Sequence, residues 1–457
     1  MDNIWIHAKG DLWDPIIDKF KKDGYWGKVI MRTSKPSIDE YRKIKSSFKL
    51  PVHMRKAHED FYETLIQNNY YLLDKLFRKT DWKTDSYNSS SFHELSWRIR
   101  IYYEFYKMCL LKKKINLVIF MNTPHMGWDN ILYETAKHCQ IKTLILDQSK
   151  FPNKFFHFFN FDDYGVFETS KILGNLKSYE VEKKVEKDWF YMKKNQGKIS
   201  TLSLKKLLTL SKYQKRIHNI IEGNDYLRLL KELSIRRYRP QAFFRFYTER
   251  NYKKNLKQLS TARYSLTNEF IYFPLHTQPE RATSIWGGIY LDQVLALERL
   301  AQIIPNEWFI YVKEAPKQKG AYRDRLFFER IKLIPNLLYL SKQSNTFELI
   351  KHSQFVATIV GTVGWEAISC GKNVLCFGWG RWYKTLPGVY EYQNNIIAHD
   401  LVKKSIDHDL LQKKTADLIN KCGTGIIYDT YIPSIPNFSM GENTKTVVES
   451  LKRILYS

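Results

Sequence analysis

The chain has 457 residues, more than one ordinary hydrophobic core accommodates, so two or three domains are expected. Hydrophobic residues make up 44% and aromatic residues 15%, with only 20 Gly and 14 Pro, which excludes a disordered or low-complexity protein. The formal net charge of +26 favours a polyanionic partner, whether nucleic acid, acidic lipid or a substrate that carries phosphate.

The N-terminus lacks the basic and apolar regions of a signal peptide, and no segment approaches the ~18 apolar residues of a membrane-spanning helix. We therefore expect a cytoplasmic protein. The five cysteines are scattered, without the close pairs of a zinc or redox site.

The first 180 residues show the alternation of strands and helices expected of an α/β domain. Short apolar runs at 4–7 and 28–31 predict strands that flank a helix through Ile16, Ile17 and Phe20. The run 115–120 predicts a buried strand, 130–138 a helix and 141–146 another strand, which together form one βαβ unit.

The alternation stops at residues 181–262, which we interpret as a basic helical connector. Within it, Lys205 to Lys257 holds 15 basic and only 4 acidic residues. Its last part mixes arginines with the aromatic residues Tyr238, Phe243, Phe244, Phe246 and Tyr247. This mixture suits an anionic inner-membrane surface. The alternative is a solvated helix face that packs on the body of the protein.

Residues 263–440 predict a second α/β domain, with strand-like runs at 270–275, 308–312, 337–340, 355–360 and 374–377. Helical patterns between these runs imply a mostly parallel sheet. The last segment, 441–457, predicts a helix that packs back across the domain boundary.

The best-defined motif follows the 355–360 run and comprises Gly361, Thr362, Val363, Gly364, Trp365 and Glu366. The glycines permit a tight turn, and Thr362 can cap the following helix so that its N–H groups face a phosphate. Glu366 can accept hydrogen bonds from ribose hydroxyls, although a glutamate in the first turn is also favoured by the helix dipole.

A second polar cluster follows the 270–275 strand and contains His276, Gln278, Glu280 and Arg281. It offers an acid/base pair and a ligand for phosphate or carboxylate. The alternative is a surface turn in which Glu280 and Arg281 are solvated charges.

Two further strand ends carry candidate residues. Lys313 ends the 308–312 strand and can neutralise a diphosphate, although a lone lysine there is more often an exposed cation. His125 and Asp129 follow the 115–120 strand and can serve as a base or bind an acceptor.

Taken together, these motifs resemble the capsular polysaccharide biosynthesis family, which includes bacterial Kdo transferases of capsule export systems. The likeness spans roughly Ile115 to Tyr390 and rests on the His125–Asp129 strand exit, the Pro274–Arg281 run, Val312–Pro316 and Gly361–Ala367. Relatives often have His-Pro where this chain has Ala315-Pro316, which argues against a CMP-linked donor unless His276 or Lys313 substitutes for that histidine.

The resemblance implies a GT-B glycosyltransferase: two Rossmann-like domains face a cleft, the C-terminal domain holds a nucleotide-sugar donor, and the N-terminal domain holds a glycan or glycolipid acceptor. From the strand-end residues themselves we expect catalytic roles for His276, Glu280, His125 and Asp129. Donor binding would fall to Gln278, Arg281, Lys313, Gly361, Thr362, Val363, Gly364 and Glu366. The resemblance implies that no metal is needed, and we further expect no cofactor and no nucleic-acid partner. A nucleotide-sugar epimerase or hydrolase and a polyanion-binding scaffold remain as alternatives.

Overall fold

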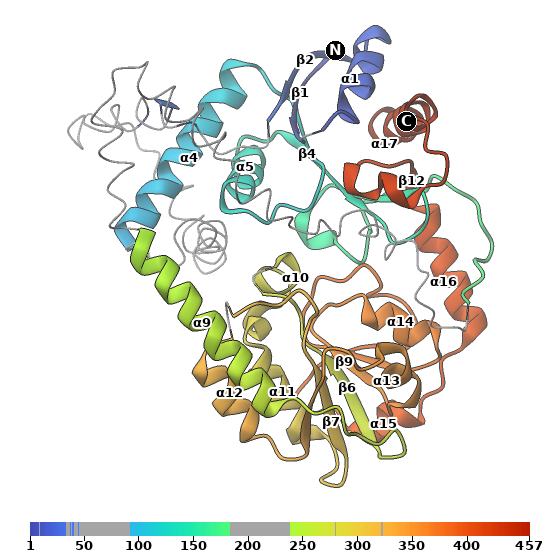
Figure 1. Cartoon of the computed structure of the whole chain (residues 1–457). Coiled ribbons are helices and arrows are strands. Elements are labelled where there is room, and N and C mark those ends of the chain that lie inside the picture. Colours follow the sequence, from blue (N-terminus) through green and yellow to red (C-terminus); the bar gives the residue numbers. More distant parts are fainter. Residues whose placement is uncertain are drawn as a thin grey trace.

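Two six-stranded sheets organise the protein, and Figure 1 shows one above the other. The computed structural model describes residues 1–8, 10–32, 37, 39–40, 44, 92–182, 238–278, 280–320 and 323–457, with only the backbone for 92–95 and 238–246. The upper sheet comes mainly from the N-terminal half of the chain and the lower sheet from the C-terminal half.

The N-terminal sheet has the order β12-β5-β4-β3-β1-β2. Its strands are β1 (Asp2–His7), β2 (Trp26–Met31), β3 (Leu117–Phe120), β4 (Lys142–Gln148), β5 (Lys154–Phe158) and β12 (Gly423–Thr424). The four strands β4, β3, β1 and β2 run parallel, whereas β4–β5 and β5–β12 are antiparallel pairs.

Helices cover both faces of this sheet. On one face lie α1 (Trp13–Lys22) and α17 (Met440–Tyr456), and on the other lie α4 (Phe92–Lys112) and α5 (Gly127–His138). Alternate residues of β1 serve the two faces: Ile4 and Ile6 join the core with α1 and α17, whereas Trp5 packs edge-on against Tyr106 of α4. This alternation explains why the centre of β1, Ile4-Trp5-Ile6, is apolar at every position.

The C-terminal sheet is entirely parallel, in the order β11-β10-β9-β6-β7-β8. Its strands are β6 (Phe270–Pro274), β7 (Phe309–Lys313), β8 (Leu337–Leu340), β9 (Val356–Thr358), β10 (Val374–Cys376) and β11 (Val389–Glu391). Numbered along the chain, the order is 3-2-1-4-5-6, which is the strand order of dinucleotide-binding Rossmann folds.

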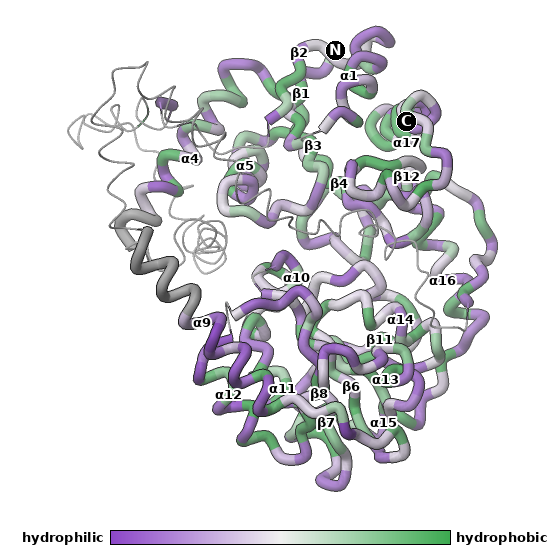
Figure 2. The backbone as a smooth tube through the Cα atoms, in the orientation of Figure 1, coloured by the Kyte–Doolittle hydropathy of each residue, from purple (hydrophilic) through white to green (hydrophobic). Residues whose placement is uncertain are grey.

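The helices of this half are α9 (Tyr238–Leu259), α10 (Arg281–Ser284), α11 (Gln293–Ile303), α12 (Arg325–Lys332), α13 (Thr346–His352), α14 (Val363–Ser369), α15 (Ala398–Lys403) and α16 (His408–Asn420). Figure 2 shows the central strand β6 as mostly hydrophobic, whereas the outer helix α12 mixes charged residues with hydrophobic ones, of which Phe327, Phe328 and Ile331 are buried. This contrast is the pattern of a sheet buried between helices.

The two halves share one hydrophobic core, because aromatic rings meet between them. Phe151, which follows β4, contacts Trp365 and Trp382 of the C-terminal half, with ring centroids 5.9 and 5.3 Å apart. The chain then returns through α16 to β12 and α17, which complete the N-terminal half.

The structure confirms the predicted α/β class and the two Rossmann-like halves of a GT-B-like protein. The predicted strand runs correspond to β1, β2, β3, β4 and β6 to β10, whereas β5, β11 and β12 were not predicted. Gly423 of β12, which lies within the predicted C-terminal domain, pairs with Phe155 of β5 in the N-terminal sheet.

The predicted connector is only partly described. Residues 183–237, which include most of the basic Lys205–Lys257 segment, lie outside the described part of the chain, as do the side chains of Tyr238, Phe243, Phe244 and Phe246. The end of the connector forms α9, as its helical pattern predicts.

Candidate functional site

The switch point of the C-terminal sheet lies between β6 and β9, its two central strands. From β6 the following strands β7 and β8 lie on one side, and from β9 the following strands β10 and β11 lie on the other. Ligands of open α/β sheets bind outside the carboxyl ends of the strands at such a point. The motifs that begin at His276 and Gly361 follow these two strands, so the fold brings them together.

His276 contacts the turn after β9 directly. Its Nε2 lies 3.0 Å from Oγ1 of Thr358, and the same oxygen accepts the backbone N–H of Gly361 at 3.2 Å. A Cβ atom on residue 361 would lie 2.8 Å from Cε1 of His276. The close packing of the imidazole therefore requires glycine at this position.

Hydrogen bonds to its backbone fix the position of His276. Its N–H donates to Oε1 of Gln293 at 2.7 Å, and its carbonyl accepts from Nε2 of Gln293 at 3.1 Å and from Arg323 at 3.0 Å. Burial, together with a smaller contribution from the positive charge of Arg323, lowers the pKa of His276 to about 4. The imidazole is therefore neutral near pH 7.

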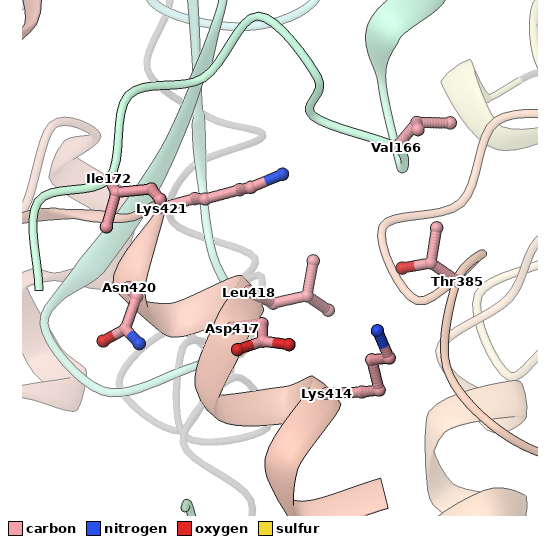
Figure 3. Close-up of a pocket in the computed structure, with 8 residues that line it drawn as sticks. All are labelled: Val166, Ile172, Thr385, Lys414, Asp417, Leu418, Asn420 and Lys421. Atoms are coloured by element: carbon pink, nitrogen blue, oxygen red, sulfur yellow. The ribbon is translucent and has the colours of Figure 1, made fainter. Parts of the chain in front are cut away.

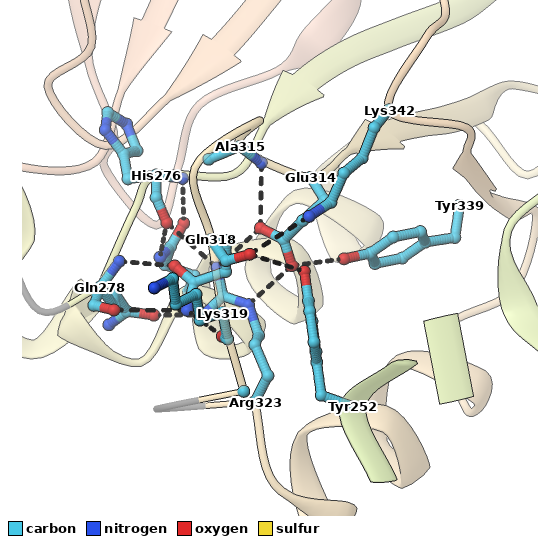
Figure 4. Close-up of polar contacts among 12 residues, drawn as sticks. Tyr252, His276, Gln278, Glu314, Ala315, Gln318, Lys319, Arg323, Tyr339 and Lys342 are labelled. Carbon is cyan, nitrogen blue, oxygen red and sulfur yellow. Dashed lines mark hydrogen bonds and ion pairs between the residues drawn. The ribbon is translucent and has the colours of Figure 1, made fainter. Parts of the chain in front are cut away.

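A buried ion pair lies behind the His276 loop (Figure 4). The side chains of Glu314 and Arg323 are fully buried, and Nε of Arg323 lies 2.9 Å from Oε2 of Glu314. The hydroxyl of Tyr339 donates to the same carboxylate at 2.8 Å. Because Arg323 also donates to the carbonyl of His276, this pair helps to position the candidate site.

Gln278 belongs to the same network. Its Oε1 accepts from Arg323, its Nε2 donates to the carbonyl of Leu291 at 2.7 Å, and its backbone N–H donates to Gln318 at 2.7 Å. In this structure the amide of Gln278, predicted to bind the donor, thus holds two loops together.

The turn after β9 differs from its prediction at Thr362. Its backbone is helical, with φ −60° and ψ −19°, and its side chain makes no cap hydrogen bond. The predicted capping role is wrong, because a capping side chain reaches the first N–H groups from an extended backbone.

Tyr383 holds this turn from the other side. Its hydroxyl donates to the carbonyl of Gly361 at 2.5 Å, and a Cβ atom on Gly364 would lie 2.3 Å from the hydroxyl oxygen. Val363 and Glu366 are both buried in α14. Gly364, the second glycine of the motif, thus leaves room for the side chain of Tyr383.

The two remaining charged candidates near β6 and β7 differ in environment. The amino group of Lys313 is buried and donates to the carbonyl of Ser344 and to Oγ1 of Thr346, both at 2.7 Å. Lys313 therefore fixes the loop that follows β8. Glu280 is exposed, immediately before α10.

Arg281 links the two halves. It donates to Oδ1 of Asn122 after β3 and lies 3.3 Å from Asp147 of β4. Its guanidinium also lies over the ring of Trp286 at 4.4 Å, and Trp286 stacks on Tyr164 at 4.5 Å. The carboxyl edges of the two sheets therefore face each other at Arg281, which is not the solvated charge of the alternative interpretation.

We expect Arg281→Met and Asp147→Asn to be non-additive in a double-mutant cycle, with a coupling of about 1–2 kcal/mol in the free energy of unfolding. The pair is largely buried, with side chains 23% and 10% exposed. The exposed pair Arg325–Glu329 is the matched control and should couple by at most ~0.5 kcal/mol. Equal coupling in both cycles, measured by urea denaturation, would contradict the interdomain role.

His125 and Asp129 form a compact unit at the start of α5. The Asp129 carboxylate accepts the backbone N–H groups of His125 at 3.1 Å and Met126 at 2.7 Å. Nδ1 of His125 lies 2.8 Å from the carbonyl of Thr123. Because a carbonyl only accepts, the neutral imidazole carries its proton on Nδ1, which leaves Nε2 as the basic nitrogen.

The sequence did not indicate Thr358, Arg323 or Tyr164 as members of the site. Thr358 gave a weak signal, as a polar residue near the end of an apolar strand. Arg323 and Tyr164 gave none, because their partners come from distant segments.

A pocket with a volume of about 340 Å³ lies beside α16 (Figure 3). It is lined by Val166, Ile172, Thr385, Lys414, Asp417, Leu418, Asn420 and Lys421. None of these eight is a predicted site residue. Within the described ranges, no group of three or more His, Cys, Asp or Glu could hold a metal ion, and no helix is long and apolar enough to cross a membrane.

Fold and site define an α/β protein with two Rossmann-like halves and a histidine at the switch point of the second. A family model described as "Capsule polysaccharide biosynthesis protein" matches residues 168–431, more than half of the chain. The chain therefore belongs to the capsule polysaccharide biosynthesis protein family. A comparison with curated proteins gave no match.

Several solved structures match the chain, and three of them compare with it as follows in sequence identity, coverage and TM-score. The beta Kdo 2,7 transferase of Thermosulfurimonas dismutans KpsC is 11% identical, with 98% of this chain and 99% of that chain covered and a TM-score of 0.36. The beta Kdo 2,4 transferase of the same KpsC is also 11% identical, with 65% of this chain and 79% of that chain covered and a TM-score of 0.30. The UDP-GlcNAc 2-epimerase of Neisseria meningitidis is 11% identical, with 99% of this chain and 100% of that chain covered and a TM-score of 0.23. Overlaps with such low TM-scores carry no argument about this chain.

Proposed function

We propose that the protein is a glycosyltransferase that moves a sugar from a nucleotide-activated donor, such as a CMP-Kdo-like compound, to a bacterial surface polysaccharide or a lipid-linked acceptor. The donor nucleotide would bind at the switch point between β6 and β9. Membership of the capsule polysaccharide biosynthesis family supports a role in making surface polysaccharide.

The contact between His276 and the Thr358–Gly361 turn is the observation that carries this proposal. It places a neutral ring and a close backbone turn at the carboxyl ends of the two central strands, where Rossmann folds bind nucleotides. The buried Glu314–Arg323 pair supports the proposal because it holds this loop in one position before a ligand arrives.

The acceptor would bind near the start of α5. The basic Nε2 of His125, with Asp129 fixing the local backbone, suits a group that takes the proton of an attacking hydroxyl. Arg281 supports a site between the halves, because it joins the carboxyl edge of one sheet to that of the other. We propose that catalysis needs no metal and that positive protein groups stabilise the leaving phosphate.

A thermal-shift screen against CMP, UDP, GDP and their sugars tests donor binding. Binding to the folded state raises the apparent stability, and we expect one nucleotide family to do so at micromolar to millimolar concentrations. The absence of a shift with every nucleotide would contradict the proposal. Product analysis with and without a glycan acceptor then separates a transferase from an epimerase or hydrolase, which needs no acceptor.

We also propose that the basic Lys205–Lys257 segment binds the anionic inner face of the cytoplasmic membrane. Its 15 basic and 4 acidic residues support this, since each basic residue near such a surface adds about 1 kcal/mol. The protein should then co-sediment with phosphatidylserine vesicles at low salt but not with phosphatidylcholine vesicles. Equal binding to both would contradict this surface contact.

A further inference from the structure

The hydroxyl of Thr358 has two hydrogen-bond partners, and their chemistry fixes the direction of each bond. It accepts the backbone N–H of Gly361 at 3.2 Å and lies 3.0 Å from Nε2 of His276. Thr358 is fully buried, and its hydroxyl has no other partner among the residues that the structure describes. The hydroxyl hydrogen therefore has one acceptor within reach, which is Nε2 of His276.

If Nε2 carried the proton instead, the Thr358 hydroxyl would accept twice and its own hydrogen would be buried without an acceptor. A buried donor left unsatisfied is costly enough to favour the other arrangement by roughly tenfold or more. Nε2 is thus the acceptor, and in the neutral ring the proton lies on Nδ1. Packing of the Gly361 backbone against Cε1 holds the ring in this orientation.

Nδ1 of His276 is available to a ligand. It makes no hydrogen bond within the described part of the chain and does not belong to the buried polar atoms that lack a partner. Figure 4 shows the ring directed away from the polar network that binds its backbone. The site therefore presents one fixed, uncharged N–H donor at the switch point.

We propose that Thr358 holds His276 as the Nδ1–H tautomer and that this N–H binds a phosphoryl oxygen of the nucleotide donor. The proposal rests on the proposed function for the identity of the ligand. It replaces the acid/base role of His276, because a neutral ring whose Nε2 is occupied by Thr358 cannot take a proton from an acceptor hydroxyl. A fixed N–H donor instead stabilises the negative charge that grows on the leaving phosphate.

NMR of ¹⁵N-histidine-labelled full-length protein tests the tautomer without a nucleotide. The chain has 12 histidines, and the signals missing from His276→Asn identify those of His276. We expect a protonated Nδ1 and an unprotonated Nε2 in the wild type and in Thr358→Ser, which keeps the hydroxyl. Thr358→Val removes the hydroxyl at equal volume and should abolish the preference. A protonated Nε2 in the wild type would overturn the proposal.

Titration with pyrophosphate tests the ligand. We expect the Nδ1-bound proton of His276 to shift with pyrophosphate but not with acetate at equal ionic strength. No shift, or an equal shift with acetate, would overturn the assignment to a phosphoryl oxygen. These outcomes differ from failure of the proposed function. If the proposed function is wrong, no nucleotide raises the apparent stability in the thermal-shift screen.

Kinetics distinguish donation from acid/base catalysis. The side-chain amide of His276→Asn can place an N–H near the position of Nδ1, whereas His276→Leu cannot. We expect the asparagine variant to keep at least about ten times the kcat of the leucine variant. Equal loss in both variants would overturn a donor role and favour proton transfer.

Discussion

Replacing Arg323 with methionine is expected to lower the free energy of unfolding by about 3–5 kcal/mol, because it leaves the buried carboxylate of Glu314 without its charge partner. Neither side chain of the pair is exposed, and the Nε–Oε2 distance is 2.9 Å. Arg323 also donates to Gln278 and to the carbonyl of His276, so the loop after β6 would lose two further bonds. Urea denaturation followed by circular dichroism measures the loss.

Arg330→Met is the matched control for this substitution. Arg330 pairs with Glu298 and Asp292, but its side chain is 28% exposed, and we expect a loss of at most ~1 kcal/mol. The double variant Arg323→Met with Glu314→Leu should recover part of the stability, because no unpaired charge then remains. If Arg323→Met cost no more than Arg330→Met, the buried pair would not support the site as we describe.

Gly361→Ala should lower the transfer rate by about 100-fold, because misplacing a catalytic group by roughly 1 Å has effects of this size. The added Cβ would lie 2.8 Å from Cε1 of His276 and 3.0 Å from Oγ1 of Thr358. The ring must therefore move away from the switch point. Binding of the nucleotide that stabilises the wild type should weaken by at least about tenfold in calorimetry.

Gly441→Ala separates this effect from a general intolerance of alanine. Gly441 lies in α17, and a Cβ atom there would meet only Oγ of Ser439, at 4.0 Å. We expect this variant to bind nucleotide as the wild type does. Wild-type affinity in Gly361→Ala would mean that the His276 ring does not form part of the nucleotide site.

The strands β6, β7, β9 and β10 of the C-terminal half were predictable because they are buried on both faces. Phe270, Ile271, Tyr272 and Phe273 of β6 are all buried, which requires the continuous apolar run that the sequence shows. β11 has no buried residue and β12 has only two residues, so neither shows the continuous apolar run of a buried strand. Residues between 183 and 237 lie outside the described ranges, so the connector remains a prediction there.

The site was only half predictable. His276 and Gly361 stood out because polar and glycine residues follow apolar strands, but their contact depends on the strand order, which places β6 beside β9. Arg323 could not be found, because an arginine in a loop normally predicts a solvated charge. Its role depends on Glu314 and Tyr339, which come from two other strand ends. The sequence also could not show that the side-chain amide of Gln278 donates to the carbonyl of Leu291, or that the amino group of Lys313 donates to the carbonyl of Ser344.

The return of the chain to its first sheet affects the order in which the protein can fold during synthesis. Trp13 of α1 donates to the carbonyl of Ile427, and Trp26 of β2 donates to Tyr456 of α17. Val447 and Leu451 of α17 belong to the same core as Trp13. The N-terminal half therefore stays incomplete until α17 has emerged from the ribosome. The parallel sheet from β6 to β11, whose contacts lie within one stretch of the chain, can assemble before it.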